Sequence, residues 1–273
     1  MNLDFDARYA AFREEVRAFL AENKPAGPVG LTGGKKEDRV AWLSLLIERG
    51  YWARTIPKEY GGHGADPDLL EPVIMDEEFN RAGVPRGLMM AQGPSMLVPT
   101  LLTHGSEEQR KRWIAPTLRG EIMWCQGYSE PGSGSDLASL QTSAVEDGDD
   151  FLISGQKIWT STADQAQMCF ILVRTEPDAK KHEGISYVLM PMDTPGIEVQ
   201  PLETMSGSIG ENSFNQVFLT DVRVPKANVV GQRGEGWKIA NTTLTHERNS
   251  LNSNAEGTLM RLARLMQSET VNG

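Results

Sequence analysis

The first 120 residues of the chain place apolar and polar positions with the period of an α-helix. Within 6–22 the apolar residues lie three or four positions apart, and a segment with two prolines, 24–28, follows directly. Such a stripe is typical of an amphipathic helix that ends at a breaker. We therefore expect this part of the chain to be helical. The same spacing predicts further helices over 40–49, 69–81 and 88–104, and one from Ser106 onward.

From residue 122 to about residue 230 the period of the pattern changes to two. A Glu-Asp-Gly-Asp-Asp sequence at 146–150 separates two short apolar runs and predicts a hairpin turn. No helix-forming run interrupts this zone, which predicts an antiparallel β-barrel or sandwich. The apolar runs that predict strands are 140–145, 151–154, 168–174, 186–190 and 215–224.

A helical pattern returns at 235–268. One helix cannot bury its apolar face alone, so we expect this helix to pack on the N-terminal helices, on a partner chain or on a further segment. The whole pattern predicts an α+β multidomain fold. Its parts are an all-α N-terminal domain over 1–120, a middle antiparallel β-barrel or sandwich domain over 121–231, and the first helix of a C-terminal helical bundle over 232–273.

Composition changes this picture mainly by what it disfavours. The chain has 273 residues, and 27 basic against 37 acidic residues give a formal net charge of −10. Nucleic acid is a poor candidate partner, because phosphate binding is driven by basic surface. The sequence has no evident signal peptide, transit peptide or apolar run long enough to span a membrane. A cytoplasmic protein is expected.

Cysteine and histidine usage gives no sign of a disulfide framework or of a metal site. Cys125 and Cys169 are the two cysteines, and we expect both to be small apolar strand residues. The four histidines are scattered along the chain without the spacing of metal ligands. We expect no metal ion.

The most informative segment reads Gly-Tyr-Ser-Glu-Pro-Gly-Ser-Gly-Ser-Asp, at 127–136, and follows a strand-like run at 121–126. Its hydroxyls, glycines and turn residues can aim several N–H and O–H groups at one point. Such a segment suits the polar edge of a cofactor or a phosphate. Further along, 157–161 reads Lys-Ile-Trp-Thr-Ser, a strand-like piece in which an indole precedes two hydroxyls.

A carboxylate lies on the apolar face of the last predicted helix. Glu247 comes three residues after Leu244 and four before Leu251, so it falls on the apolar stripe, and Arg248 falls there too. One interpretation is a buried structural arrangement of Glu247 with Arg248. The other is a general base whose pKa is raised by desolvation, which the abstraction of an α-proton near neutral pH requires.

The two polar segments, in this order and at this spacing, resemble the flavin-binding signature of acyl-CoA dehydrogenases. The order of zones, helical then β then helical, is also similar to that family, and the resemblance covers the chain from near residue 5 onward. It implies bound FAD and an acyl-CoA substrate. The residues that this likeness places at the flavin are Gln126, Tyr128, Ser129, Gly134, Ser135, Trp159, Thr160 and Ser161.

Individual roles also follow from the resemblance. Trp159 would lie against the flavin ring, although the same residue could equally be a core aromatic of the sheet, and Ser161 would bond the redox edge of the ring. Ser135 would contact the CoA part of the substrate, and Arg248 is assigned to the substrate as well. Glu247, directly before an arginine on the first C-terminal helix, matches the catalytic base of the isovaleryl and long-chain members. The implied reaction oxidises an acyl-CoA to a trans-2-enoyl-CoA.

The resemblance also raises an expectation about completeness. Family members continue through a C-terminal four-helix domain that completes the acyl pocket and forms a tetramer core, so a fragment or a naturally short subunit is expected here. Electron-transfer flavoprotein is the implied electron acceptor, within a homo- or hetero-oligomer that acts in fatty acid β-oxidation. Two alternatives stay open: a non-catalytic subunit paired with a full-length dehydrogenase, and a flavin monooxygenase or oxidase on the same fold.

Overall fold

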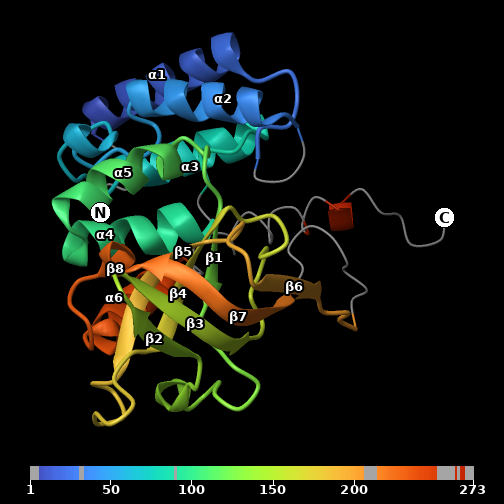
Figure 1. Ribbon diagram of the computed structural model, residues 1–273. Helices are drawn as coiled ribbons and strands as arrows, with labels where there is room; N and C mark the ends of the chain where they lie inside the picture. Colours follow the sequence, from blue (N-terminus) through green and yellow to red (C-terminus); the bar gives the residue numbers. More distant parts are fainter. Residues whose placement is uncertain are drawn as a thin grey trace.

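The helices of the first half of the chain lie together on one side of a β-sheet (Figure 1). The computed structural model describes residues 6–30, 34–88, 91–205, 214–250, 262 and 265–267. The predicted helical character of the N-terminal part is confirmed. Its elements are α1 (Ala7–Asn23), α2 (Lys36–Glu48), η1 (Lys58–Tyr60), α3 (Glu71–Ala82), η2 (Gly93–Leu97), α4 (Val98–His104) and α5 (Glu107–Leu118).

Local sequence explains where two of these helices begin. The Asp6 side chain caps α1 by accepting a hydrogen bond from the backbone N–H of Arg8. A capping box opens α5, in which the Ser106 hydroxyl accepts from the N–H of Gln109 and the Gln109 side chain accepts from the N–H of Ser106. The residues expected to start these helices therefore satisfy their first N–H groups.

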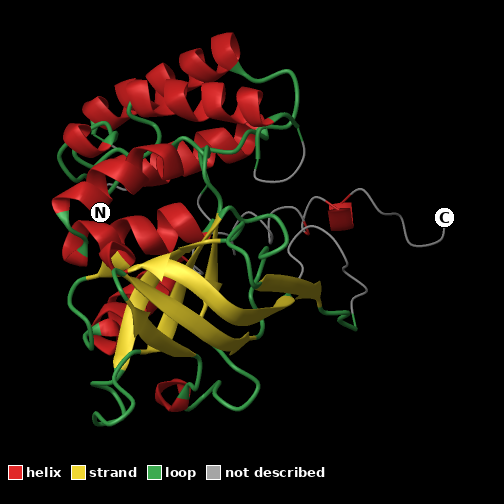
Figure 2. Cartoon of the chain, in the orientation of Figure 1, coloured by secondary structure: helices red, strands yellow, loops and turns green. Residues whose placement is uncertain are grey.

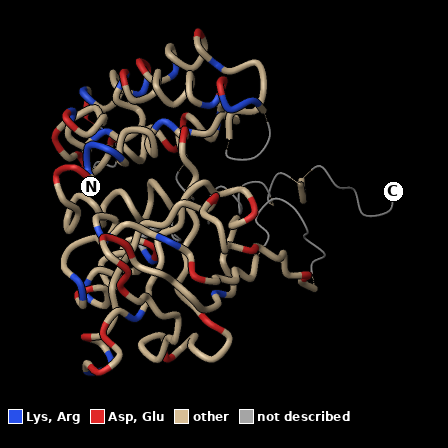
Figure 3. The backbone as a smooth tube through the Cα atoms, viewed as in Figure 1, with Lys and Arg blue, Asp and Glu red and all other residues tan. Residues whose placement is uncertain are grey.

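Packing of α1 against α3 combines apolar burial with one buried carboxylate. Phe19 of α1 is buried and its ring lies 4.7 Å from that of Tyr51. Glu78 of α3 is only 2% exposed and pairs with Arg13 and Arg17 of α1 at 2.6 and 3.0 Å. Basic and acidic residues are interspersed along these helices (Figure 3). The pairing therefore compensates the buried charge of Glu78 at this interface.

The stretch from 88 to 104 differs from the single helix that its pattern predicts. The structure has a π-helical turn, η2, that runs directly into α4, and Pro94 and Pro99 lie at the start of these two elements. Proline has no N–H to donate, so each proline removes a bond of a regular helix. The prolines therefore explain the irregular start, while residues 89 and 90 lie outside the described part.

The middle of the chain forms one sheet (Figure 2), which confirms the predicted β domain. Along the sheet the order is β6-β7-β3-β2-β4-β5-β8, and β1 pairs with β4. The short β6 and β8 were not predicted from the pattern. The strands are β1 (Trp124–Gly127), β2 (Ser143–Asp147), β3 (Asp150–Lys157), β4 (Met168–Arg174), β5 (Ile185–Pro191), β6 (Ile197–Pro201), β7 (Asn215–Pro225) and β8 (Val229–Val230), with the short helices η3 (Leu137–Ser139) and η4 (Lys226–Asn228) between strands.

The sheet is mixed rather than wholly antiparallel, which corrects one detail of the prediction. β1 runs parallel to β4, from the pair Trp124–Met168 to the pair Gly127–Ile171, and β2 meets β4 in parallel at one pair. A parallel pair needs a long connection between its strands. The chain from β1 to β4 provides one, because it contains the loop after β1 and the whole β2–β3 hairpin.

Side chains of β4 and β5 alternate between two separate cores. Phe170 and Tyr187 point to the core shared with the helices, and their rings stack at 5.9 Å. Cys169 and Val188 point to the core inside the β domain, where Cys125 also lies. Both cysteines are buried and free, as expected. The two strands are thus buried on both faces, which explains their nearly continuous apolar sequences.

The last described helix, α6 (Gly236–Ser250), packs on η2, on α4 and on β5. The Thr243 hydroxyl lies 2.9 Å from that of Thr100 on α4, and Leu244 packs against the helical core. Of the three expected partners of this helix, the N-terminal helices cover its described part, and β5 covers it too. Most of the helical pattern after residue 250 lies outside the described part of the chain.

Candidate functional site

The two polar segments singled out in the sequence lie against each other at the end of β1. The backbone N–H of Ile158 donates to the Ser129 carbonyl over 2.9 Å. The Lys157 ammonium donates to the Tyr128 carbonyl at 3.2 Å and to Oε1 of Glu130 at 2.8 Å. Segments 127–136 and 157–161 therefore form one structural unit, although they are far apart in the sequence.

The serine- and glycine-rich loop has a closed base and an open tip. Glu130 and Ser133 exchange backbone hydrogen bonds at 3.0 Å in both directions, and the buried Ser133 hydroxyl lies 3.0 Å from that of Ser139. Gly134 and Ser135 are exposed at the tip, and a Cβ added at Gly134 would meet nothing within 4 Å. The loop thus presents two of its predicted ligand contacts, Gly134 and Ser135, on open space.

Trp159 is held in a conformation that side chains of L-residues rarely adopt. Its φ is +61° and its side chain is 57% exposed, with the ring edge-to-face against Phe214 at 5.8 Å. Thr162, three residues later, has a φ of +60°. Trp159 is therefore not a core residue of the sheet. Strained backbone that persists in a fold is concentrated at functional sites, and an exposed indole offers a flat apolar face.

The remaining predicted flavin residues divide into two groups by exposure. Gln126, Ser129 and Ser161 are half-buried and can be reached from outside. Thr160 and Tyr128 are buried, and the Thr160 hydroxyl is fully enclosed without a hydrogen-bond partner. The side chains of Thr160 and Tyr128 therefore lie behind the residues that can be reached from outside, and their contact with the flavin stays a prediction.

Glu247 lies on α6, one turn after Thr243, and is half-buried, while Arg248 is exposed. Burial raises the pKa of Glu247, and the neighbouring charge of Arg248 opposes this shift. A fully buried pair of Glu247 with Arg248 is thus not what the structure contains. The raised pKa is the property expected of a carboxylate that takes up a proton near neutral pH.

The end of β1 and the face of α6 that carries Glu247 are close neighbours. Burial first of all raises the pKa of the Tyr128 hydroxyl, and the negative charge of Glu247 raises it further. The Tyr128 ring packs edge-to-face against Tyr187 at 6.3 Å, and the Thr243 hydroxyl reaches the Tyr187 hydroxyl at 3.5 Å. The fold therefore brings the candidate base near the serine-rich segment.

Sequence reasoning assigned no role to Phe214, Glu130 or Lys157. Phe214 had no signal of its own, because its contact with Trp159 depends on the tertiary fold. Lys157 did have one, since it continues the alternation of the buried residues Phe151 and Ile153 along β3. A charge at an inward-facing strand position requires a buried partner, and Glu130 is that partner.

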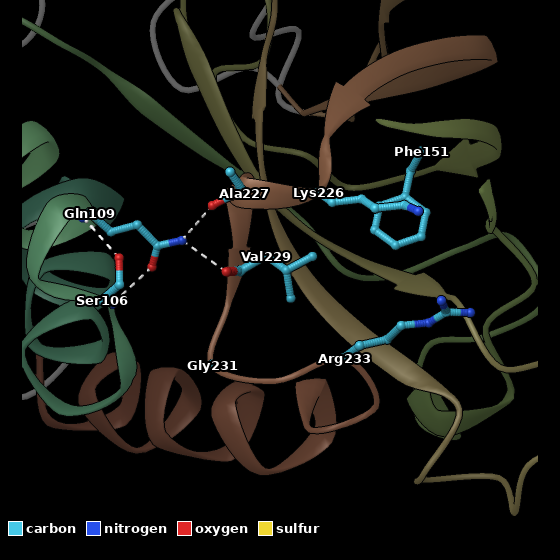
Figure 4. Close-up of a pocket in the computed structure, with 8 residues that line it drawn as sticks. All are labelled: Ser106, Gln109, Phe151, Lys226, Ala227, Val229, Gly231 and Arg233. Atoms are coloured by element: carbon cyan, nitrogen blue, oxygen red, sulfur yellow. Dashed lines mark hydrogen bonds between the residues drawn. The ribbon is translucent and has the colours of Figure 1, made fainter. Parts of the chain in front are cut away.

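A cavity of about 330 Å³ lies elsewhere, between α5 and the chain that links β7 to α6 (Figure 4). The Gln109 amide donates to the carbonyls of Ala227 and Val229 at 3.0 and 2.8 Å. Lys226 and Arg233 lie near the ring of Phe151, and both pair with Glu146 outside this lining. None of the predicted site residues lines the cavity, and its cations are already neutralised. The cavity therefore lies at the junction between the N-terminal helices and the β domain.

The described residues contain no cluster of three or more groups able to hold a metal ion. Over the same ranges, every helix is too short or too polar to cross a membrane.

Comparison with known families identifies the chain. The model of the acyl-CoA dehydrogenase N-terminal domain matches residues 6–121, and that of the acyl-CoA dehydrogenase middle domain matches residues 125–222. The chain therefore belongs to the acyl-CoA dehydrogenase family, whose members use FAD.

Individual relatives agree with this assignment. Acyl-CoA dehydrogenase IpdE1 of Mycobacterium tuberculosis is 41% identical over 246 residues, which is 87% of this chain and 62% of IpdE1. The human mitochondrial short-chain specific acyl-CoA dehydrogenase is 35% identical over 208 residues, or 76% of this chain and 50% of that enzyme. The chain thus spans less than two thirds of the length of these relatives.

Solved structures give the same result. A Tcur3481-Tcur3483 steroid ACAD matches with a TM-score of 0.75 and 36% identity, over 96% of this chain and 66% of that chain. The ChsE4-ChsE5 complex from Mycobacterium tuberculosis matches with a TM-score of 0.75 and 32% identity, over all of this chain and 69% of that one.

Proposed function

We propose that this chain carries the flavin- and substrate-facing part of an FAD-dependent acyl-CoA dehydrogenase. The observation that carries the proposal is the strained and exposed Trp159, held beside the serine-rich loop. A fold maintains such a residue only when its surroundings over-determine it. Family membership supplies the cofactor class, and the half-buried Glu247 nearby supplies a base of suitable pKa.

The reachable residues fit a flavin. The exposed indole of Trp159 offers an apolar face to a planar ring, and the half-buried hydroxyls of Ser129 and Ser161 can bond the polar edge of that ring. Gln126, near the end of β1, adds a half-buried amide. Gly134 leaves room for a ligand to approach the backbone. FAD, when bound, accepts a hydride from the β-carbon of the substrate.

Glu247 performs the proton chemistry in this proposal. Its carboxylate removes the pro-R α-proton of the acyl-CoA, and the electron pair of that C–H bond becomes the new double bond as the β-hydride leaves. The product is a trans-2-enoyl-CoA, and Glu247 holds the proton. Burial favours this step because it makes the ionised carboxylate more basic. In this proposal the CoA portion meets Ser135, which is exposed at the loop tip, and Arg248, which is exposed on α6.

The substrate class and the partners belong to the same proposal. The neighbour described as a steroid ACAD is 36% identical to this chain, which favours a ring-bearing acyl-CoA over a straight fatty acyl chain. Two structural neighbours carry two-component names, which supports a homo- or hetero-oligomer. Electron-transfer flavoprotein as acceptor and a cytoplasmic location remain predictions, as do the domain limits 1–120, 121–231 and 232–273.

The test is anaerobic titration of the purified, FAD-loaded chain with acyl-CoA thioesters, followed in the visible spectrum. Bleaching of the flavin band together with an enoyl-CoA product supports the proposal. The non-catalytic subunit would instead be favoured by two results together. The flavin of this chain stays oxidised, and a complex of this chain with a full-length dehydrogenase keeps its activity when Glu247 is replaced by Gln. Rapid reoxidation by O₂ with release of peroxide, or a hydroxylated product, would favour the oxidase or monooxygenase alternative.

A further inference from the structure

We propose that the buried ion pair of Glu130 with Lys157 is a positioning pair, which fixes the Trp159 turn against the Ser129 segment so that both meet one flavin. The proposal rests on the proposed function and adds two residues that do not touch the ligand. Lys157 is 0% exposed, and Glu130 is 8% exposed.

The pair lies where three parts of the chain meet. Oε1 of Glu130 accepts from the Lys157 ammonium at 2.8 Å and from the Thr142 N–H and hydroxyl at 2.9 and 2.6 Å. Oε2 accepts from the N–H of Gln141 at 2.6 Å. Lys157 also donates to the Tyr128 carbonyl at 3.2 Å. Both charges are therefore compensated, which a buried pair requires.

The position of the pair argues for a role in geometry as well as in packing. Ser129 directly precedes Glu130, and Trp159 follows Lys157 by two residues, so each charged residue adjoins one predicted flavin contact. Between them, the Ile158 N–H donates to the Ser129 carbonyl at 2.9 Å. A change at the pair is thus transmitted to both flavin-facing segments through at most two peptide links.

The strained turn is held from its other end as well. The N–H of Thr160 donates to the carbonyl of Asn215 at 3.0 Å, and the N–H of Asn215 donates back at 3.1 Å. Trp159, with its φ of +61°, is therefore bracketed by Lys157 on one side and Thr160 on the other. Strained backbone needs this kind of over-determination to persist. Without the ion pair, the anchor before Trp159 keeps its backbone bonds and loses the side-chain contact that ties it to the Glu130 loop.

Paired variants separate positioning from simple stability. Glu130→Gln and Lys157→Met each leave one buried group uncompensated, whereas the double variant removes both charges and is expected to recover much of the lost stability. The double variant is expected to unfold at a higher temperature than either single variant. A positioning role predicts that it still binds FAD on the order of tenfold more weakly than the wild type, with a shifted flavin absorption band. Lys181→Met is the matched control, because it removes an exposed ion pair to Asp136 of the same loop.

The measurement is FAD affinity by fluorescence quenching, with the visible spectrum and the unfolding midpoint of the same samples. Restored stability together with wild-type affinity and spectrum in the double variant overturns the inference. Thr142→Val removes the hydrogen bond from the Thr142 hydroxyl to Glu130 and keeps the ion pair. This variant is expected to bind FAD more weakly at a nearly unchanged unfolding midpoint. Wild-type FAD affinity in Thr142→Val would also count against the positioning role. A wild-type chain that takes up no FAD overturns the proposed function itself, a result distinct from failure of the pair alone.

Discussion

Replacing Trp159 by glycine and by alanine tests the strained turn directly. The indole is 57% exposed, so roughly 90 Å² of a large side chain is protected from water, worth about 2 kcal/mol. Both variants lose that contribution. Glycine also relieves the cost of a left-handed L-residue, about 1–2 kcal/mol, and adds an entropic cost of about 0.5–1 kcal/mol. Trp159→Gly is therefore expected to be more stable than Trp159→Ala by about 0.5–1 kcal/mol.

The assay is urea or thermal unfolding of the two variants under identical conditions. In a chain of this size the difference corresponds to roughly 1–4 °C in midpoint. Ser161, whose φ is not in the left-handed region, is the control position, where alanine should be the more stable replacement. An alanine variant at 159 that equals or exceeds the glycine variant would refute the strained conformation. Both variants are expected to lose FAD affinity.

Three further outcomes follow from the structure. Gly236→Ala at the start of α6 should lower the free energy of unfolding by about 1–3 kcal/mol in denaturant titrations. The reason is that a Cβ at this position would lie 2.5 Å from the backbone carbonyl carbon of Ser186. An unchanged free energy of unfolding would show that α6 can shift. His104 bonds Thr242 at 2.9 Å, and burial lowers its pKa, so the unfolded chain binds its proton first as the pH falls. Stability should thus decline as the pH drops below about 6.5 towards the lowered folded pKa, and the His104→Gln protein should lack this slope in midpoints measured from pH 5 to 8. The rate of flavin bleaching should fall as the pH drops through the pKa of Glu247, which burial raises above the ordinary range of a carboxylate. If the low-pH side of this rate profile is unchanged in Glu247→Asp, the titration belongs to another group.

Local patterns in the sequence were sufficient for most of the fold. The 3.6-residue stripes located the helices because each buries one face, and the predicted start at Ser106 agrees with the start of α5. The parallel pairing of β1 with β4 was not predictable, since period-two alternation fixes which face a residue occupies but not the direction of its neighbouring strand. The apolar alternation that would predict β6 is weak, because the residues of this strand are exposed or half-buried.

The candidate site was predictable only where chemistry is visible in the residue types themselves. The hydroxyls and glycines of 127–136 and the carboxylate of Glu247 on an apolar stripe pointed to a cofactor and a base. That Thr160 is enclosed while Trp159 is exposed depends on a backbone turn that residue types do not encode. The partnership of Glu130 with Lys157 required the three-dimensional fold, although the inward position of Lys157 on β3 was a usable signal.

Glu247 is the proposed base of a flavin-dependent acyl-CoA oxidation. The most direct measurement is stopped-flow reduction of the FAD-loaded chain by an acyl-CoA without oxygen, in wild type and in Glu247→Gln, with FAD affinity measured on both. We expect equal FAD affinity in both proteins and rapid bleaching in the wild type, with bleaching slowed on the order of a hundredfold or more in the variant. Bleaching at the wild-type rate in the variant would show that Glu247 is not the base, because the α-proton would then leave to another group.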